Sequence, residues 1–438
     1  MEIERLERIK KTTAVHLAME AKDALKKITE DFPDNPDAME YFYSLLHKFY
    51  TDGELFKEGV RGVDKVSTTL IGTMCIQVPE ELIYAAGARP IRLCSGAYAY
   101  DQTGAEFMPA KSCSLVKATL GMLNIKNMPF KDSLSAIIVS TTCDQKKKAA
   151  DMLKEMGYKT YTLEMPSVKD TEEARFYWQN SVKNFASAIE DISGNRITKK
   201  GLNEAVMKTN RARAEFRRFN NFRKSAHPLI YGKDSFVVAN AYFFDGIEQW
   251  TEALAKLNAE LEDRDNRGVS VANRHAPRIL FTGSPAIFPN LKLPLLIEQS
   301  GGVIVADEVC SSSRLLYDSV SFDEGNLYDM IPAIADRYLK PCTCPCFAEN
   351  EDRKRKLLEM VRGFNVDGVV YQAFSGCHLY EMEHKSVGKL LEAEGVPMLY
   401  IETDYSPEDT GQLSTRIEAF MESIKNRKRS KLQGGCDR

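Results

Sequence analysis

The sequence predicts an α/β protein with two parallel-sheet domains, an N-terminal pair of helices and a helical insert between the domains. Short apolar strands alternate with segments of helical periodicity from residue 79 to residue 163, and again from residue 278 onward. Residues 171–265 between them show helical periodicity alone. A chain of 438 residues is long enough for two or three such domains.

Residues 1–62 are predicted to form an N-terminal helical arm. Apolar residues at Leu6, Ile9 and Leu17 follow helical spacing. The prolines between residues 32 and 36 interrupt this pattern, and a second helix is expected over residues 37–49. We expect the arm to be a dimerisation or packing element.

Residues 63–170 are predicted to form the first α/β domain. Its expected helices cover residues 80–86, 112–123 and 144–156. A turn is expected over residues 87–90, where Gly87 and Pro90 lie. The expected strands cover residues 91–94, 135–140 and 158–163.

Residues 171–272 are predicted to form a helical insert or cap. The segment is rich in Glu, Arg, Lys, Asn and Ala at helical periodicity and lacks a strand pattern. Its basic run from Arg211 to Arg223 is interpreted as a solvated helix face.

Residues 273–427 are predicted to form the second α/β domain. Its strands are expected over residues 278–283, 302–306, 367–371 and 398–402, with a last helix over residues 415–424. The polar segment 428–438 is predicted to be a disordered tail, which makes Cys436 a poor metal ligand.

The two α/β domains share one pattern. Residues 136–166 and 368–404 each consist of an apolar strand, a few mostly small residues, a cysteine, a helix, a glycine and a second strand. The simplest interpretation is two similar Rossmann- or flavodoxin-like domains that face each other.

The composition excludes several classes of protein. Hydrophobic residues make up 43% and charged residues 28%, and the 59 basic side chains nearly balance the 62 acidic ones. No global field would therefore attract nucleic acid or an anionic membrane. The N-terminus lacks the apolar stretch of a signal peptide, and no segment has the roughly 18 apolar residues that span a bilayer. We expect a cytoplasmic protein.

The ten cysteines carry the strongest chemical signal. Disulfides are disfavoured in the cytoplasm, so burial, catalysis or metal binding must account for most of these residues. Cys143 and Cys377 each fall where a strand ends and a helix begins. Ligands bind at this edge of an open α/β sheet, and the positive end of the helix favours a thiolate.

Other cysteines follow the same logic. Cys113 opens a helix, and Cys75 and Cys310 each follow an expected strand or turn. Without Cys94 and the tail cysteine, each half of the chain can supply three metal ligands. The candidates are Cys75, Cys113 and Cys143 from the first half, and Cys310, Cys377 and one of Cys342, Cys344 and Cys346 from the second.

Rival chemistries have less support in the sequence. Structural zinc sites usually show repeated C-x2-C pairs, which are absent, and there are only six histidines. Cys377 and His378 are adjacent, but neighbours at a helix start point in different directions, which disfavours a nucleophile–base pair. Phosphate-binding glycine motifs are also absent, so any ATP would be hydrolysed by a partner.

Several stretches resemble the family of 2-hydroxyacyl-CoA dehydratase and benzoyl-CoA reductase subunits. They are PEELIYAAGARPIRLC, FMPAKSCSLVKATLG, STTCDQKKKAADML, GVVYQAFSGCH and IETDYSPEDTGQLSTRIEAF, and the resemblance runs from about residue 65 to residue 425. It implies a four-iron cubane on the cysteines that match the family's ligands, Cys113, Cys143 and Cys377.

Within that family the chain looks most like the double-cubane cluster proteins of anaerobes, because of its additional cysteines and the run from Thr142 to Lys148. This resemblance implies two cubanes joined by a sulfide. The added ligands would be Cys75, Cys310 and Cys342, with Cys344 or Cys346 as substitutes for Cys342.

The resemblance implies two functions, and a third stays open beside them. The leading hypothesis is a homodimer that accepts low-potential electrons from an ATP-dependent activator, itself an iron–sulfur protein, and reduces small molecules bound between the domains. The first alternative is an (R)-2-hydroxyacyl-CoA dehydratase subunit with one four-iron cluster, paired with a different subunit and acting on an acyl-CoA. The second is a non-enzymatic electron carrier or cluster-maturation factor. The substrate and the acid–base residues stay open, and His378, Asp144 and Glu402 are interpreted as supporting or capping groups.

Overall fold

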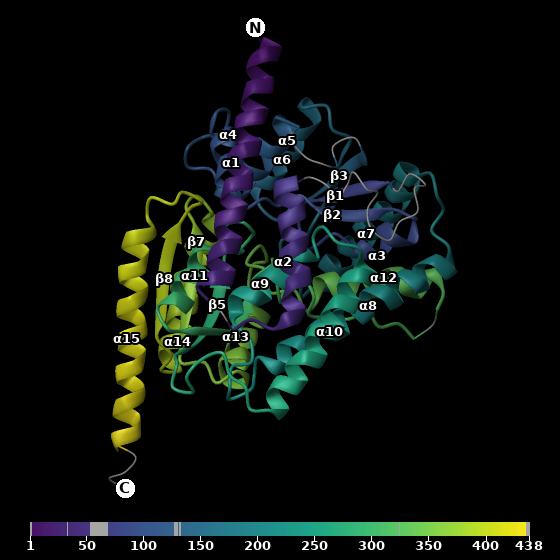
Figure 1. The fold of residues 1–438 in the computed structure, drawn as a ribbon. Helices are drawn as coiled ribbons and strands as arrows, with labels where there is room; N and C mark the ends of the chain where they lie inside the picture. Colours follow the sequence, from purple (N-terminus) through teal and green to yellow (C-terminus); the bar gives the residue numbers. More distant parts are fainter. Residues whose placement is uncertain are drawn as a thin grey trace.

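The computed structural model describes residues 2–32, 34–52, 69–126, 130, 133–323 and 325–434. It confirms the predicted fold class, with two parallel four-stranded sheets surrounded by helices (Figure 1). The expected boundary between residues 62 and 63 lies outside the described residues, as does Cys436.

The first sheet has the strand order β2-β1-β3-β4, with all neighbours parallel. Its strands are β1 (Leu70–Thr73), β2 (Arg89–Arg92), β3 (Leu134–Ser140) and β4 (Thr160–Leu163). Its helices are α3 (Glu80–Ala85), α4 (Tyr98–Ala105), α5 (Ser114–Asn124) and α6 (Asp144–Glu155). The apolar, fully buried β1 lies inside the sheet, as expected for a parallel strand covered on both faces.

β2 begins earlier in the chain than the sequence predicts. The expected turn includes Pro90, but this residue lies inside the strand. The amides of Arg89 and Leu93 donate toward β1, to the carbonyls of residues 69 and 73, so the intervening Pro90 faces the other side. β2 is an edge strand, and its outer side needs no ladder donor.

The second sheet has the equivalent order, β6-β5-β7-β8. Its strands are β5 (Arg278–Gly283), β6 (Val303–Glu308), β7 (Gly368–Phe374) and β8 (Met398–Thr403). Its helices are α11 (Lys292–Gln299), α12 (Leu327–Leu339), α13 (Glu351–Gly363), α14 (His378–Ala393) and α15 (Thr410–Gly434). The two domains therefore repeat one topology.

The insert is helical, consisting of α7 (Glu172–Ser193), α8 (Lys199–Phe222), α9 (Gly232–Ala241) and α10 (Ile247–Asn266). The interpretation of its basic run as a solvated face is wrong for two residues. Arg213 forms a buried ion pair with Glu81 of the first domain, with a nitrogen–oxygen distance of 2.6 Å. Arg223 forms one with Asp307 of the second domain at 2.7 Å. These pairs attach the insert to both domains.

The N-terminal arm packs against its own chain. It consists of α1 (Glu2–Glu30), a 3-10 turn η1 (Asp37–Met39), α2 (Glu40–His47) and a π-helical turn η2 (Lys48–Asp52). The carboxylate of Glu20 accepts hydrogen bonds from the backbone amides of Tyr98 and Ala99, at the start of α4. A role of the arm in dimerisation stays a prediction.

The end of the chain differs from the prediction. The expected disordered tail includes residues 428–434, but α15 continues to Gly434 along one edge of the second domain (Figure 1). Lys428 forms an ion pair of 2.6 Å with Asp367, just before β7. Lys428 is one of the charged residues on which the prediction of a disordered tail rests, and its ion pair holds α15 against the second domain.

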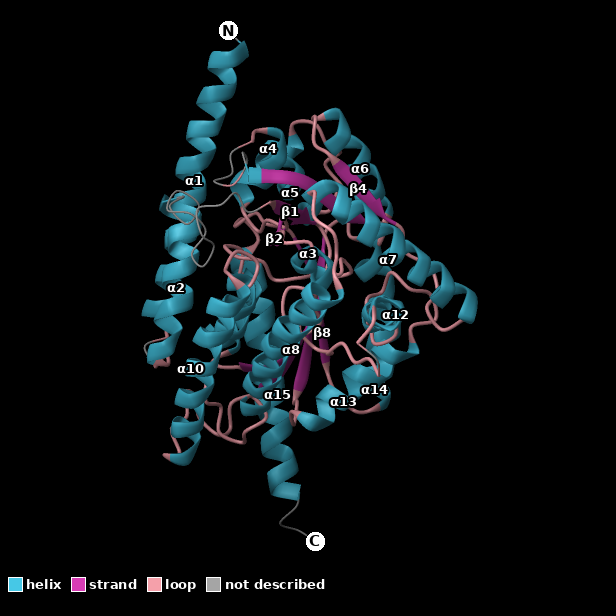
Figure 2. Cartoon of the chain, turned by 90° about the vertical axis from the view of Figure 1, so that its right-hand side faces the viewer, coloured by secondary structure: helices cyan, strands magenta, loops and turns pink. Residues whose placement is uncertain are grey.

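The helix α12 follows β6 in the chain but packs with the first domain and the insert. Met330 and Ile334 of α12 share a buried apolar cluster with Ile71 of β1 and Trp178 of α7. The indole of Trp178 donates a hydrogen bond of 2.8 Å to the carbonyl of Ala335, and the two helices lie side by side in Figure 2. The segment 342–346 that follows α12 is thereby brought to the first domain.

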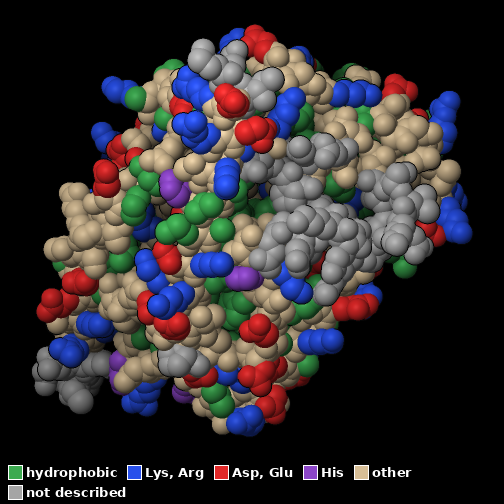
Figure 3. Space-filling view, turned by 45° about the horizontal axis from the view of Figure 1, so that its top comes forward, with side chains coloured by type: hydrophobic (Ala, Val, Ile, Leu, Met, Phe, Trp, Pro, Cys, Tyr) green, Lys and Arg blue, Asp and Glu red, His purple; other side chains and the backbone are tan. Residues whose placement is uncertain are grey.

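The surface carries mixed charge. On the face drawn in Figure 3, basic and acidic side chains are interspersed over the parts of the chain that are described. No helix of the described residues is long and apolar enough to cross a membrane.

Candidate metal centre

Three of the candidate cysteines occupy the N-cap positions of helices. Cys113 precedes α5, Cys143 precedes α6 and Cys377 precedes α14. Burial raises the pKa of the Cys143 thiol, and the nearby Lys146 and its backbone amide oppose this rise. A helix start supplies amide dipoles that favour a thiolate, and a thiolate is the form of cysteine that binds metal.

Cys113 and Cys377 bring the two domains together. Their thiols share a hydrogen bond, which lowers the pKa of Cys113 and raises that of Cys377. Gln145 spans the same gap: its side-chain oxygen accepts a hydrogen bond of 2.8 Å from the amide of Cys113, and its amide nitrogen donates one of 2.8 Å to the carbonyl of Gly376. One residue of α6 therefore holds all three cysteine loops in register.

Gly376 permits this close approach. Its φ is +78°, and a β-carbon there would lie 2.0 Å from the carbonyl oxygen of Lys111. No other residue fits this position without displacing the loop that carries Cys113.

A second group of thiols lies around the end of β6. Glu308, the last residue of that strand, accepts hydrogen bonds from Arg314 at 2.6 and 2.8 Å and from the hydroxyl of Thr343, and it also pairs with Arg353. Burial opposes its ionisation, but Arg314 and Arg353 lower its pKa to about 2. This ionised carboxylate fixes the segments on which Cys310 and Cys342 lie.

The thiols of this group differ in their protonation. Burial raises the pKa of Cys310 and of Cys342 to about 12 each. A hydrogen bond from Cys346 lowers the pKa of Cys344 to about 6. Cys342 also accepts a hydrogen bond from the side-chain nitrogen of Gln77 in the first domain.

Cys75 connects the two groups. Its thiol contributes to the raised pKa values of Cys143, Cys310 and Cys342, an effect that requires proximity. It also lies 3.9 Å from the hydroxyl of Thr142. Each described cysteine likewise either changes the pKa of another cysteine or has its own pKa changed by one. We call this set the thiol cluster: Cys75, Cys94, Cys113, Cys143, Cys310, Cys342, Cys344, Cys346 and Cys377.

Lys146 lies among these thiols without a carboxylate partner in the described part of the chain. Its ammonium group donates a hydrogen bond of 3.2 Å to Thr142. Burial lowers its pKa, but the thiols of Cys75 and Cys143 raise it further, so that the net direction is upward. A cation at this position would offset the negative charge of thiolates or of an anionic group that these loops hold.

The donor set fits an iron–sulfur cluster better than other metals. Thiolates from both domains and a nearby cation suit an anionic cluster, whereas histidine does not contribute to the set. Among the described residues, no group of three or more His, Cys, Asp or Glu side chains is arranged so that it could hold a metal ion. The assignment of individual ligands therefore stays a prediction.

A family model for the D-component of 2-hydroxyglutaryl-CoA dehydratase matches residues 75–424. The chain belongs to this family. The match begins at Cys75 and includes the rest of the described thiol cluster. The family assignment made from the sequence motifs is confirmed.

Relatives within the family include dehydratase and reductase components. YjiM of Escherichia coli (strain K12), whose name gives it as a candidate dehydratase subunit, is 31% identical over 81% of this chain and 91% of its own length. The beta subunit of (R)-phenyllactyl-CoA dehydratase from Clostridium sporogenes is 24% identical over 86% and 99%. One of the benzoyl-CoA reductase subunits from Thauera aromatica is 25% identical over 82% and 92%.

Cys94 is the member of the thiol cluster that the sequence reasoning set aside. It follows the end of β2 by two residues, as Cys310 follows the end of β6. Burial raises its pKa, with a further contribution from Cys75. The signal that could have identified it is the repeated strand order, which could be recognised only once β2 was placed at the correct residues.

The three supporting residues named from the sequence lie toward the outside of the site. Asp144 pairs with Lys147 at 3.2 Å, and Glu402 accepts a hydrogen bond of 3.0 Å from Ser375. His378 begins α14. Gln145 and Lys146, by contrast, lie within the site, although the sequence reasoning gave them no separate role.

Proposed function

We propose that this family member holds a double-cubane iron–sulfur cluster and accepts low-potential electrons from an ATP-dependent activator in order to reduce small molecules. The observation that supports the proposal is the thiol cluster itself, in which loops of both domains contribute. Cys75, Cys113, Cys143, Cys310, Cys342 and Cys377 would be the ligands, and Cys344 or Cys346 could replace Cys342.

When bound, the cluster would supply a store of electrons at low potential, tuned by burial, charge and hydrogen bonds. The chain's own residues have separate tasks. Gln145 holds the loops of Cys113 and Cys377 in register. Lys146 offsets negative charge on the thiolates, and the buried network around Glu308 fixes the loop of Cys310.

A second candidate function is that of a dehydratase subunit, because YjiM and the phenyllactyl-CoA enzyme are described by that activity. This alternative needs one four-iron cluster at Cys113, Cys143 and Cys377. The remaining thiols would then be structural. An electron carrier without its own substrate would have the same cluster and no turnover. The homodimer, the activator partner and the cytoplasmic location belong to the main proposal.

The test is iron and acid-labile sulfide per chain, measured on full-length protein purified without oxygen, with spectra before and after dithionite. About eight irons and nearly nine sulfides are expected for a double cubane. Cys310→Ser should lower the iron content. About four irons in the wild type, unchanged by Cys310→Ser, would support the dehydratase alternative in place of the double cubane. No iron in a folded sample would overturn both.

A further inference from the structure

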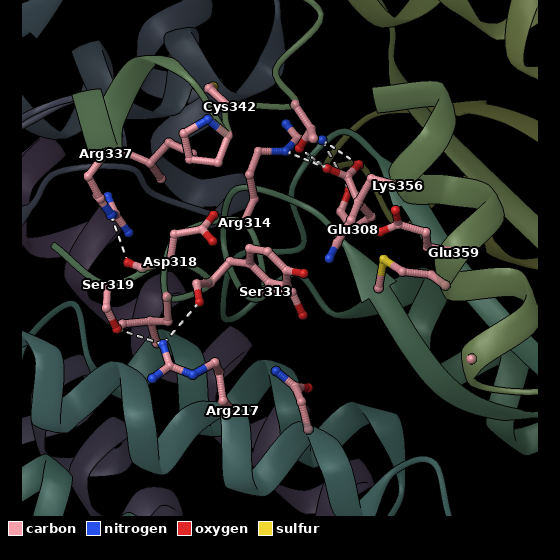
Figure 4. Close-up of a pocket in the computed structure, with 18 of the residues that line it drawn as sticks. Arg217, Glu308, Ser313, Arg314, Asp318, Ser319, Arg337, Cys342, Lys356 and Glu359 are labelled. Carbon is pink, nitrogen blue, oxygen red and sulfur yellow. Dashed lines mark hydrogen bonds and ion pairs between the residues drawn. The ribbon is translucent and has the colours of Figure 1, made fainter. Parts of the chain in front are cut away.

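A cavity of about 640 Å³ lies between the insert and the second domain. It is lined by α8, by the loop after β6, by the end of α12 and by α13. In Figure 4, Arg217 extends from α8 and Arg337 from α12, while Lys356 comes from α13 and Cys342 lies at the opposite end from Arg217. The cations are thus spread around the cavity, and one side of it reaches Cys342 of the thiol cluster.

Four cations line the cavity without forming an ion pair in the described part of the chain: Arg217, Lys224, Arg337 and Lys356. Their hydrogen-bond and ring partners are neutral. Arg217 donates to the hydroxyl of Ser319 at 2.7 Å, and Arg337 donates to the carbonyls of residues 315 and 318 at 2.8 and 2.9 Å. Lys356 lies over the ring of Tyr317, with its nitrogen 3.3 Å from the ring centre.

The acidic side chains of the cavity do not neutralise this charge. Glu308 is paired with Arg314 and Arg353, and Glu359 is paired with Arg355 outside the cavity. Asp318 has no ion pair among the described residues and acts on Arg217, Arg337 and Lys356. Glu81 also acts on Arg337, but it is paired with Arg213. An uncompensated positive charge in a partly enclosed space favours an anionic ligand.

The side of the cavity near Cys342 offers a hydrogen-bond acceptor. Gln77 is 2% exposed, and its side-chain oxygen has no hydrogen-bond partner among the described residues. Its nitrogen donates to Cys342, so the oxygen is the free group of this side chain, which lines the cavity. A buried acceptor without a partner costs free energy, and a donor on a ligand would remove this cost.

We propose that this cavity binds an organic anion with at least two carboxylate or phosphate charges, which lie against the four cations while a hydrogen-bond donor of the ligand meets Gln77 beside Cys342. Its volume is in the range of small-molecule sites, and Leu316, Met360 and Phe364 provide apolar lining for a carbon skeleton. The assignment of this anion as the substrate rests on the proposed function, whereas the binding itself does not.

The test is isothermal titration calorimetry on anaerobically purified, full-length protein at constant ionic strength. The probes are succinate for a carboxylate source, and pyrophosphate and coenzyme A for a phosphate source. We expect at least one probe to bind more tightly than about 1 mM. Charge-assisted hydrogen bonds are strong enough that Arg217→Gln and Lys356→Gln should each weaken binding about tenfold.

Two matched controls are available on the same helices. Arg218→Gln removes an exposed cation of α8 that pairs with Glu262, and Lys354→Gln removes one of α13 that pairs with Glu351. Each should change the dissociation constant less than about twofold if the effect is local. Equal effects of test and control variants would overturn the proposal, because they would indicate general screening.

Iron content measured on the same samples separates the two proposals. Absence of binding in a wild-type protein that holds about eight irons would overturn the anion site and leave the proposed function intact. Binding that depends on Arg217 and Lys356 in a protein without iron would support the anion site and overturn the proposed function.

Discussion

Cys143 lies three residues after the end of β3, and Cys377 lies three residues after the end of β7, the equivalent strand of the other domain. Cys94 and Cys310 likewise each follow an equivalent strand, β2 or β6, by two residues. The domains differ at the first strand. Cys75 follows β1, whereas Ser284 and Pro285 follow β5.

The difference has a structural basis. The amide of Ser284 donates a hydrogen bond to the carbonyl of Gln372, and its hydroxyl accepts one from the amide of Phe374. The loop after β5 is therefore bound to β7. The segment of Cys342 to Cys346 lies between α12 and α13, as Cys113 lies between α4 and α5, and α12 brings this segment toward the first domain. The two domains therefore match at the ends of two pairs of equivalent strands and differ at the first strand, where Cys75 has no counterpart.

The largest expected effect concerns the cysteine that has no counterpart. Under the double-cubane proposal, Cys75→Ser should lower the iron content from about eight to about four per chain, because Cys75 is a ligand. Cys94→Ser should leave about eight irons. Iron analysis of both variants shows whether Cys75 or Cys94 is the ligand. If only Cys94→Ser lowered the iron content, Cys94 would be the ligand, and the two halves of the chain would be more symmetric than proposed.

The ion pairs of the basic run provide a second comparison of the two domains. Arg213→Leu leaves Glu81 buried without its closest cation, and Arg223→Leu does the same to Asp307. Each variant should lose about 3–5 kcal/mol of unfolding free energy, the usual cost of breaking a buried pair. Urea denaturation measures this loss.

The control in the same run is Arg218→Leu, whose pair with Glu262 is exposed and should matter by less than about 1 kcal/mol. A loss confined to Arg213→Leu would mean that the insert is anchored to the first domain alone.

The smallest expected effect concerns the contact between the domains. Gly376→Ala and Gly395→Ala each place a side chain at a positive φ, +78° and +68°, which costs about 1–2 kcal/mol. Only Gly376 faces a carbonyl, that of Lys111, whereas a β-carbon at Gly395 meets nothing within 4 Å. The first variant should therefore lose about 1–3 kcal/mol more, as overpacking does.

Thermal unfolding measures the two stabilities, and iron content shows whether the loops of Cys113 and Cys377 still meet. Equal losses in both variants would show that the close approach of the domains at Gly376 is not needed.

The sequence supplied the local features of this protein. The paired pattern of strand, cysteine and helix identified Cys143 and Cys377 as helix starts, and the structure places both at N-cap positions. It also predicted the fold class, with two parallel sheets and a helical insert, because periodicity and chain breaks are properties of neighbouring residues. The same local reasoning failed at β2, where a proline suggested a turn although an edge strand can accept one.

What only the tertiary structure decided are the partners of residues far apart in the chain. The sequence shows a basic run from Arg211 to Arg223, but which of its cations are buried depends on carboxylates that lie far away in the sequence, Glu81 and Asp307. The cavity cations that form no ion pair among the described residues and the bridge made by Gln145 likewise depend on contacts between distant segments. Periodicity records which face of an element is apolar, whereas the charge and hydrogen bonds of a site depend on which faces meet after folding.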